Sequence, residues 1–245
     1  MKEIINPADK LILALDGMNK EQAFALISKI PGLKWVKVGL ELFVSEGPEI
    51  VNDLRDLDLN IFLDLKFHDI PTTMAAACRQ AAKTGANLIT VHASAGYQAL
   101  VESNEAAIFG AKEVGLTPPR LLAVTILTSW KQKKLENELA VNQSIKERVE
   151  MMAKLAFKAG IGGCICSPQE VAKLRELYSE PFELITPGIR LDINYLDDQA
   201  RVLTPYKAIK AGATRLVIGR PVTKSSEPLK VFNNLCGEVV KAHLD

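Results

Sequence analysis

Residues 64–71 read Asp-Leu-Lys-Phe-His-Asp-Ile-Pro and directly follow the short apolar run Ile61-Phe62-Leu63. That run has the composition of a β-strand, and the closing proline suits the first turn of a helix. Side chains alternate along a strand, so Asp64 and Lys66 are expected on one face, with Asp69 close by. A charge beside an apolar wall needs a partner or a task. The stretch therefore predicts a buried strand that ends in a reactive cluster or in a structural ion network.

The same alternation of short apolar runs and longer amphipathic segments extends along the whole chain. The strands are expected at 11–16, 34–39, 61–66, 87–92, 120–127, 162–166, 182–186 and 214–219. In the first half of the chain, helices are expected over about 20–30, from the second predicted strand to about 58, from the third to about 84, and over about 96–114. In the second half they are expected over about 145–159, after a cap at Ser167 with Pro168 as the first residue, over about 201–211, and from about Pro221. The polar segment 128–144 is predicted to be a long functional loop.

Eight strand–helix units in 245 residues match the size of a (β/α)₈ TIM barrel. The chain has no internal linker or break in composition, so we expect one domain over residues 1–245. A doubly wound open sheet is the alternative architecture. It is disfavoured because no glycine-rich dinucleotide fingerprint follows the first predicted strand.

Composition limits the classes of partner. Hydrophobic residues make up 48% of the chain, charged residues make up 24%, and the formal net charge is +1. This balance gives no support for a general nucleic-acid or membrane surface. Residues 1–7 lack the apolar core of a signal peptide, and the apolar runs are too short to span a bilayer. We therefore expect a cytoplasmic protein with a small-molecule substrate.

The metal-ligating residue types are scattered. They are Cys78, Cys164, Cys166 and Cys236, together with His68, His92 and His243. The one close pair of cysteines has a single residue between them, which is the wrong spacing for a C-x-x-C redox or zinc element. We therefore expect reduced structural thiols, no metal site and no cofactor.

In a TIM barrel the carboxyl ends of the strands form the active-site face. This rule brings five charged residues to one mouth: Asp16, Lys37, Asp64, Lys66 and Asp69. Neighbouring carboxylates should keep both lysines protonated. Lys66 then suits a proton donor, since a Schiff-base nucleophile needs a depressed pKa.

The seventh and eighth strand ends suit a phosphate group. Gly219 and Arg220 end the eighth predicted strand, and the turn 186–190 adds Gly188 and Arg190. Glycine lets backbone N–H groups approach an anion, and arginine grips phosphate with a planar fork. Barrels often bind phosphate after these two strands. The alternative is a pair of structural turns with solvated arginines.

Three further polar sites remain open on sequence alone. His92 is either a polar wall of the site or a satisfied core histidine. Thr128 and Ser129 either contact the amide edge of a ligand or turn the chain. Gln199 is either a ligand contact or solvated.

Several motifs together resemble the orotidine 5′-phosphate decarboxylase family, in family order and over nearly the whole chain. They are Ala14-Leu15-Asp16, Lys37-Val38-Gly39, the stretch 64–71, Val91-His92-Ala93, Leu127-Thr128-Ser129, Pro187-Gly188-Ile189-Arg190 and Ile218-Gly219-Arg220. The resemblance implies a TIM barrel that converts orotidine 5′-phosphate to UMP and CO₂ without metal or cofactor.

The resemblance also implies a role for individual residues. Lys66 would donate the proton to C6 of the pyrimidine, beside Asp64 at the departing carboxylate. Lys37 and Asp16 would bind the ribose hydroxyls and hold the charge network, and Thr128 would line the pyrimidine pocket. The phosphate would be held by Arg190, Gln199, Gly219 and Arg220. The residues that reach into a neighbouring subunit's site would be Asp69, Ile70 and Thr73, so a homodimer with shared sites is implied.

The chain departs from the usual family pattern at Thr72, where asparagine is usual, and at Ala95, where glycine is usual. Neither change removes a group with an implied chemical role. The same charged stretch is also similar to that of 3-keto-gulonate-phosphate decarboxylases, which would require magnesium and a sugar phosphate. A non-catalytic phosphate-binding barrel is the alternative from a different class. The turn 186–190 and Gly219-Arg220 favour the pyrimidine nucleotide.

Overall fold

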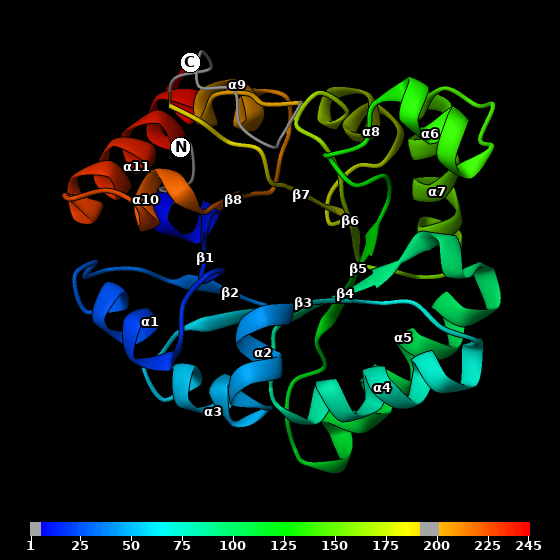
Figure 1. Ribbon diagram of the computed structural model, residues 1–245, viewed down its shortest axis with the longest axis horizontal. Coiled ribbons are helices and arrows are strands. Elements are labelled where there is room, and N and C mark those ends of the chain that lie inside the picture. The colour runs from blue at the N-terminus through cyan, green and yellow to red at the C-terminus, as the bar shows by residue number, and fades with distance from the viewer. Residues whose placement is uncertain (1–5, 192–200) are drawn as a thin grey trace.

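A computed structural model describes residues 6–191 and 201–245, and eight parallel strands form a closed barrel in it (Figure 1). Each strand pairs with its neighbour in chain order, and β1 pairs with β8 to close the ring. The strands are β1 Leu11–Ala14, β2 Trp35–Gly39, β3 Asn60–Phe67, β4 Leu88–His92, β5 Arg120–Val124, β6 Gly163–Ile165, β7 Glu183–Thr186 and β8 Arg215–Ile218. The (β/α)₈ barrel predicted from the sequence is confirmed.

Helices surround the ring, and the colours of Figure 1 run once around it from blue to red. The helices are η1 Pro7–Lys10, α1 Lys20–Ile27, α2 Leu40–Glu46, α3 Glu49–Arg55, α4 Pro71–Lys83, η2 Ala93–Ala95, α5 Tyr97–Glu113, α6 Gln132–Leu139, α7 Ile145–Lys158, α8 Val171–Leu177, α9 Pro205–Lys210, α10 Arg220–Thr223 and α11 Pro228–Leu244. Pro71 is the first residue of α4, as predicted.

Three helix predictions were wrong in detail. The run expected to continue to 58 is broken into α2 and α3 at Gly47, which has a φ of 73°, and at the proline that follows it. The polar segment 128–144 contains α6 instead of being a plain loop. Ser167 does not begin a helix, because a turn follows it, in which the Glu170 backbone N–H donates to the Ser167 carbonyl at 3.0 Å. The helix after β6 therefore starts at Val171.

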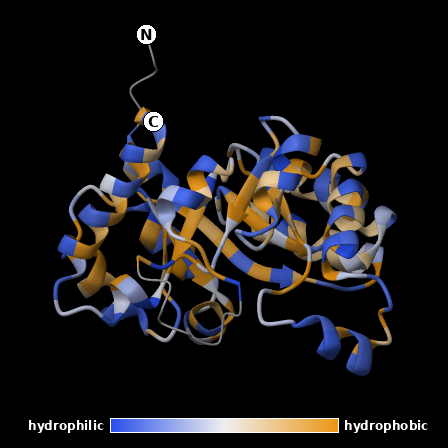
Figure 2. Cartoon of the chain, turned by 90° about the horizontal axis from the view of Figure 1, so that it is seen from above, coloured by the Kyte–Doolittle hydropathy of each residue, from blue (hydrophilic) through white to orange (hydrophobic). Residues whose placement is uncertain are grey.

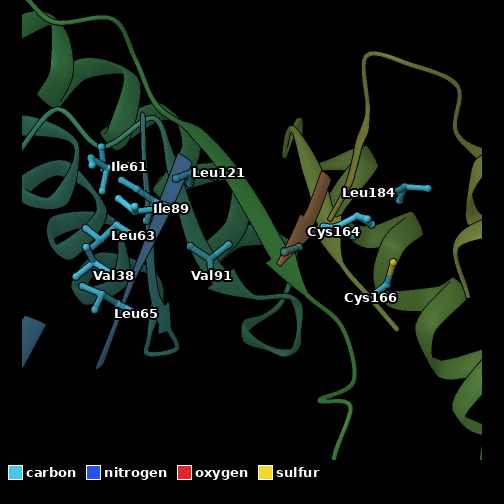
Figure 3. Close-up of a cluster of buried hydrophobic side chains, with 14 of the residues drawn as sticks. Val38, Ile61, Leu63, Leu65, Ile89, Val91, Leu121, Cys164, Cys166 and Leu184 are labelled. Atoms are coloured by element: carbon cyan, nitrogen blue, oxygen red, sulfur yellow. The ribbon is translucent and has the colours of Figure 1, made fainter. Parts of the chain in front are cut away.

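The alternation along the strands creates two separate cores. One face of each strand packs outward against the helices, and Figure 3 shows part of this layer, including Leu63 on β3 and Val91 on β4. The other face fills the barrel with Ile12, Ala14, Trp35, Phe62, Leu88, Leu122, Ile185 and Val217. Figure 2 accordingly shows mostly orange strands inside and blue residues on the surrounding helices.

The floor of the barrel is sealed by polar and aromatic groups. The Arg215 guanidinium forms an ion pair with Glu183 and lies 4.5 Å from the centre of the Trp35 ring. Arg120 contacts the same carboxylate at 3.0 Å. Because this end is filled, the barrel can open only at the carboxyl ends of its strands. Within the described residues, the structure contains no helix that is both long and apolar enough to cross a bilayer.

Candidate active site

A cavity of about 720 Å³ opens at the carboxyl ends of the strands. This volume suits a ligand of nucleotide size. The polar and charged residues that line the cavity are Asp16, Lys37, Glu41, Asp64, Lys66, Thr128, Ser129, Arg190, Arg220, Thr223 and Lys224. They come from turns and strand ends on opposite sides of the ring, so the barrel brings together residues far apart in sequence.

Four charged side chains form one continuous network in the cavity. The Lys37 ammonium lies 2.8 Å from Asp16 Oδ1 and 3.3 Å from Asp64 Oδ2. The Lys66 ammonium lies 2.8 Å from the same Asp64 oxygen. Positions 37, 64 and 66 follow the inward-facing alternation of Trp35 and Phe62, which explains why β2 and β3 aim them into the mouth.

The charges of this network support one another despite their burial. Burial alone would raise the pKa of Asp64, but Lys37 and Lys66 outweigh it and hold that pKa below its ordinary value of 3.8. Burial would likewise lower the pKa of Lys37, but Asp64 and Asp16 outweigh it and raise that pKa above 10.5. Asp64 and Lys37 are therefore charged at neutral pH.

The backbone at Lys66 has an unusual conformation. Its φ is 52°, in the left-handed region that residues with a side chain rarely adopt. Between paired positions, β3 advances from Leu63 to Phe67 while β4 advances only from Ile89 to Val91. The two additional residues on β3 form a bulge, a device common beside active sites. The left-handed conformation costs about 1–2 kcal/mol, so contacts around Lys66 must offset that cost.

The other side of the cavity carries the predicted phosphate residues. Arg190 is buried, with 8% of its surface exposed, and its guanidinium donates to the Ile189 carbonyl at 2.9 Å. Gly188 has a φ of 78°, which permits the tight turn after β7. Gly219 and Arg220 line the same cavity from the end of β8. The two predicted halves of the anion site are therefore brought together.

The remaining predicted contacts have three different outcomes. Thr128 and Ser129 line the cavity, so they belong to its wall. His92 is not among the lining residues, and its ring lies 5.3 Å from that of His68. Burial, with His68 and Lys66 as further causes, lowers the pKa of His92. Gln199 lies outside the described residues.

Asp69 does not join the charged ring of its own chain, contrary to the sequence prediction. β3 ends at Phe67, and the exposed Asp69 carboxylate accepts a hydrogen bond from the backbone N–H of Ile70 at 2.7 Å. Ile70 is 65% exposed, and Thr73 is also exposed at the start of α4. None of these three side chains lines the cavity that Lys66 enters.

Sequence reasoning missed four residues of the site, one of which, Thr223, is a further polar residue of the cavity wall. Glu41 lines the cavity and accepts a hydrogen bond from the Gly17 backbone at 3.0 Å. Lys224 adds a cation beyond Arg220. Thr90 is fully buried, and its hydroxyl lies between Asp64 and the Lys66 backbone. One signal was available for Thr90, because it is a polar residue at an inward-facing position of a strand.

Within the described residues, the structure has no group of three or more histidine, cysteine or acidic side chains arranged to hold a metal ion. The four cysteines are free thiols, as predicted. Burial raises the pKa of Cys78 to about 11 and that of Cys164 further. These buried thiols are packing groups at neutral pH.

A family model, sequence relatives and a solved structure that match this chain all carry the same family name. A family model described as "Orotidine 5'-phosphate decarboxylase / HUMPS family" matches residues 9–235. An orotidine 5′-phosphate decarboxylase of Prochlorococcus marinus is 59% identical over 96% of this chain and 98% of its own length. The orotidine 5′-phosphate decarboxylase of Parasynechococcus marenigrum is 57% identical over 96% of this chain and 95% of its own length. The crystal structure of orotidine 5′-phosphate decarboxylase from Lactobacillus acidophilus superposes with a TM-score of 0.84 at 37% identity, covering 94% of this chain and 99% of that chain.

Proposed function

This chain belongs to the orotidine 5′-phosphate decarboxylase / HUMPS family, and we propose how its own residues carry out the reaction. The reaction is the decarboxylation of orotidine 5′-phosphate to UMP and CO₂, a step of pyrimidine nucleotide synthesis. One observation supports the residue assignment above all: the Lys37–Asp64–Lys66 network faces Arg190 and Arg220 within one cavity. The cavity thus offers one region for the reacting ring and another for the phosphate.

Lys66 is the proton donor. As the bond from C6 to the carboxylate breaks, CO₂ leaves and the electron pair remains on C6. The Lys66 ammonium transfers a proton to that carbon, and the resulting amine regains a proton from water. Asp64, held charged by both lysines, lies beside the departing carboxylate and keeps Lys66 in place at 2.8 Å. Lys37 and Asp16 bind the ribose hydroxyls, and Thr128 contacts the pyrimidine.

The energetic demand of the reaction explains why fixed charges are needed. The developing carbanion is poorly delocalised, so the enzyme has to lower the barrier by about 20 kcal/mol. A fixed ammonium stabilises negative charge where it develops, without reorganisation at the moment of reaction. Proton transfer contributes a further factor of about 10²–10⁴. The remainder comes from binding energy at the phosphate, where Arg190, Gly219, Arg220 and Gln199 are the proposed contacts.

The direct test measures UMP formation from orotidine 5′-phosphate in buffer that contains EDTA. We expect rapid conversion, because Lys66 supplies the charge that a metal ion would otherwise provide. Conversion only after magnesium is added would contradict the metal-free mechanism and favour the 3-keto-gulonate-phosphate type of chemistry. Tight UMP binding without conversion under either condition would favour a non-catalytic binding barrel.

We further propose that the active form is a homodimer with shared sites. Asp69, Ile70 and Thr73 are exposed and lie outside the cavity of their own chain. Large apolar side chains are also exposed just after β2, namely Leu40 at 55% and Val44 at 79%. These features support an interface at this part of the ring, through which the partner's Asp69 completes each cavity.

Mixing two damaged variants tests the sharing of sites. Lys66→Ala and Asp69→Asn subunits are expected to be nearly inactive alone. After subunit exchange at equal amounts, half of the dimers contain one subunit of each kind, and one of their two sites is intact. About one quarter of native activity should therefore return. Mixing Lys66→Ala with Asp64→Asn is the matched control, since both changes fall in the same cavity wall and no intact site can form. Equal recovery in both mixtures, or in neither, would refute shared sites.

A further inference from the structure

The hydroxyl of Thr90 occupies a central position beneath the reactive network. Thr90 lies on β4 with no exposed surface. Its Oγ1 accepts a hydrogen bond from the backbone N–H of Lys66 at 2.8 Å and donates one to Asp64 Oδ1 at 3.0 Å. The direction of both bonds is fixed, because an amide N–H can only donate and an ionised carboxylate can only accept.

The bulge in β3 explains why this hydroxyl is needed. Two additional residues separate the paired positions of β3 and β4 on either side of Lys66. The Lys66 N–H therefore bonds to a side chain of β4 and not to a strand carbonyl. An unpaired N–H at this depth would be costly, so the bond favours the left-handed backbone of Lys66, with its φ of 52°.

The second bond orients Asp64. With Oδ1 held by Thr90, the other oxygen, Oδ2, faces Lys66 at 2.8 Å and Lys37 at 3.3 Å. One hydroxyl thus fixes both the backbone from which Lys66 extends and the carboxylate that receives its ammonium.

We propose that Thr90 is a positioning residue for decarboxylation, which holds the Lys66 backbone and the Asp64 carboxylate in the geometry that proton donation requires. Thr90 is absent from the cavity lining, so it acts through these two residues and does not touch the substrate. The inference rests on the proposed function of Lys66, and it adds that proton donation also requires a hydroxyl on a different strand, β4.

Steady-state kinetics of Thr90→Val test the proposal, because valine preserves the shape and removes the hydroxyl. We expect kcat to fall by about 10- to 100-fold, as for other residues that orient reactive groups. KM for orotidine 5′-phosphate should change by less than about threefold, because the substrate contacts remain. Thr90→Ser keeps the hydroxyl and should restore kcat to within about threefold of the native value.

Thr125→Val is the matched control. Thr125 is also nearly buried at a strand end, and its hydroxyl donates to the Ile165 carbonyl at 3.0 Å, away from the charged network. It should lose stability but retain kcat. A folded Thr90→Val enzyme with native kcat, or a Thr90→Ser enzyme as slow as Thr90→Val, would overturn the proposal.

Two measures keep the test decisive. If Thr90→Val does not fold, Thr90→Ala removes the hydroxyl without placing a methyl group against the Lys66 N–H, and the same loss of kcat is expected. Hydrogen exchange at the Lys66 amide provides a readout that needs no turnover, and it should be faster in the variant than in the native chain. Native-like protection of that amide would overturn the proposal. Absence of turnover in the native chain would instead count against the proposed function.

Discussion

Lys66→Ala is expected to reduce kcat for orotidine 5′-phosphate by at least about 10⁴-fold, because it removes both electrostatic stabilisation and proton donation. Nucleotide binding should persist, since the variant leaves the proposed phosphate contacts Arg190 and Arg220 in place. Rapid-quench measurement of UMP formation, combined with calorimetric titration of UMP, separates the two effects.

The matched control for this variant is Lys20→Ala. Lys20 also forms a close ion pair, 2.6 Å from Asp53, but it is 42% exposed and outside the cavity. Exposed pairs contribute little, so turnover should be unchanged. If Lys66→Ala retained more than about one hundredth of native kcat, Lys66 would not be the proton donor, because general acid catalysis alone is worth about 10²-fold or more.

Orotidine, the substrate without its phosphate, is expected to react with a kcat/KM at least about 10⁴-fold below that of orotidine 5′-phosphate. Arg190 and Arg220 are the proposed contacts, and a guanidinium that grips phosphate makes two charge-assisted hydrogen bonds, each worth about 1.5 kcal/mol or more. The four bonds together supply about 6 kcal/mol, and about 1.4 kcal/mol corresponds to tenfold. Part of the loss should appear in kcat, since binding energy remote from the reacting carbon also serves catalysis. Equal rates for both substrates at saturation would refute this division of labour.

Arg220→Ala provides the complementary measurement. It should reduce kcat/KM for the phosphorylated substrate by about 10²-fold or more, but should leave the slow reaction of orotidine nearly unchanged. Arg148→Ala is a suitable control, because that guanidinium, on α7, donates to the side chain of Gln143 just before the helix and does not line the cavity. A comparable loss with both substrates would mean that Arg220 supports the fold and not the phosphate.

The sequence predicted the strands and the core of the site because both depend on a period of two. Lys37, Asp64 and Lys66 share the inward-facing alternation of β2 and β3, so their meeting required only the parallel pairing of these two consecutive strands. Arg190 and Arg220 follow from the turns after β7 and β8. These features are local in the sequence, and the fold adds only their order around the ring.

The failures arose where geometry depends on non-local pairing. The bulge in β3 is a mismatch with β4 that no local pattern in either strand predicts. Asp69 lies beyond the end of β3, where its carboxylate accepts the Ile70 N–H and does not line the cavity. Ser167 has the sequence pattern of a helix cap, but a turn separates it from α8, and the Glu170 carboxylate of that turn forms an ion pair with Arg201, which is distant in sequence. Thr90 could have been noticed as a polar residue at an inward-facing strand position. Its two hydrogen-bond partners, however, depend on the bulge in β3.

The division of charge in the cavity has a consequence for capture of the substrate. Among the described lining residues are five cations and three carboxylates, a net charge of +2, in a chain whose formal net charge is only +1. The carboxylates, Asp16, Glu41 and Asp64, all lie on or just after β1 to β3, whereas Arg190, Arg220 and Lys224 follow β7 and β8. With Lys37 and Lys66 counted, the side of β1 to β3 carries a net charge of −1, and the side of β7 and β8 carries +3. We therefore expect the dianionic phosphate of an approaching nucleotide to be attracted to the β7 and β8 side before contact. Added salt should weaken this electrostatic steering.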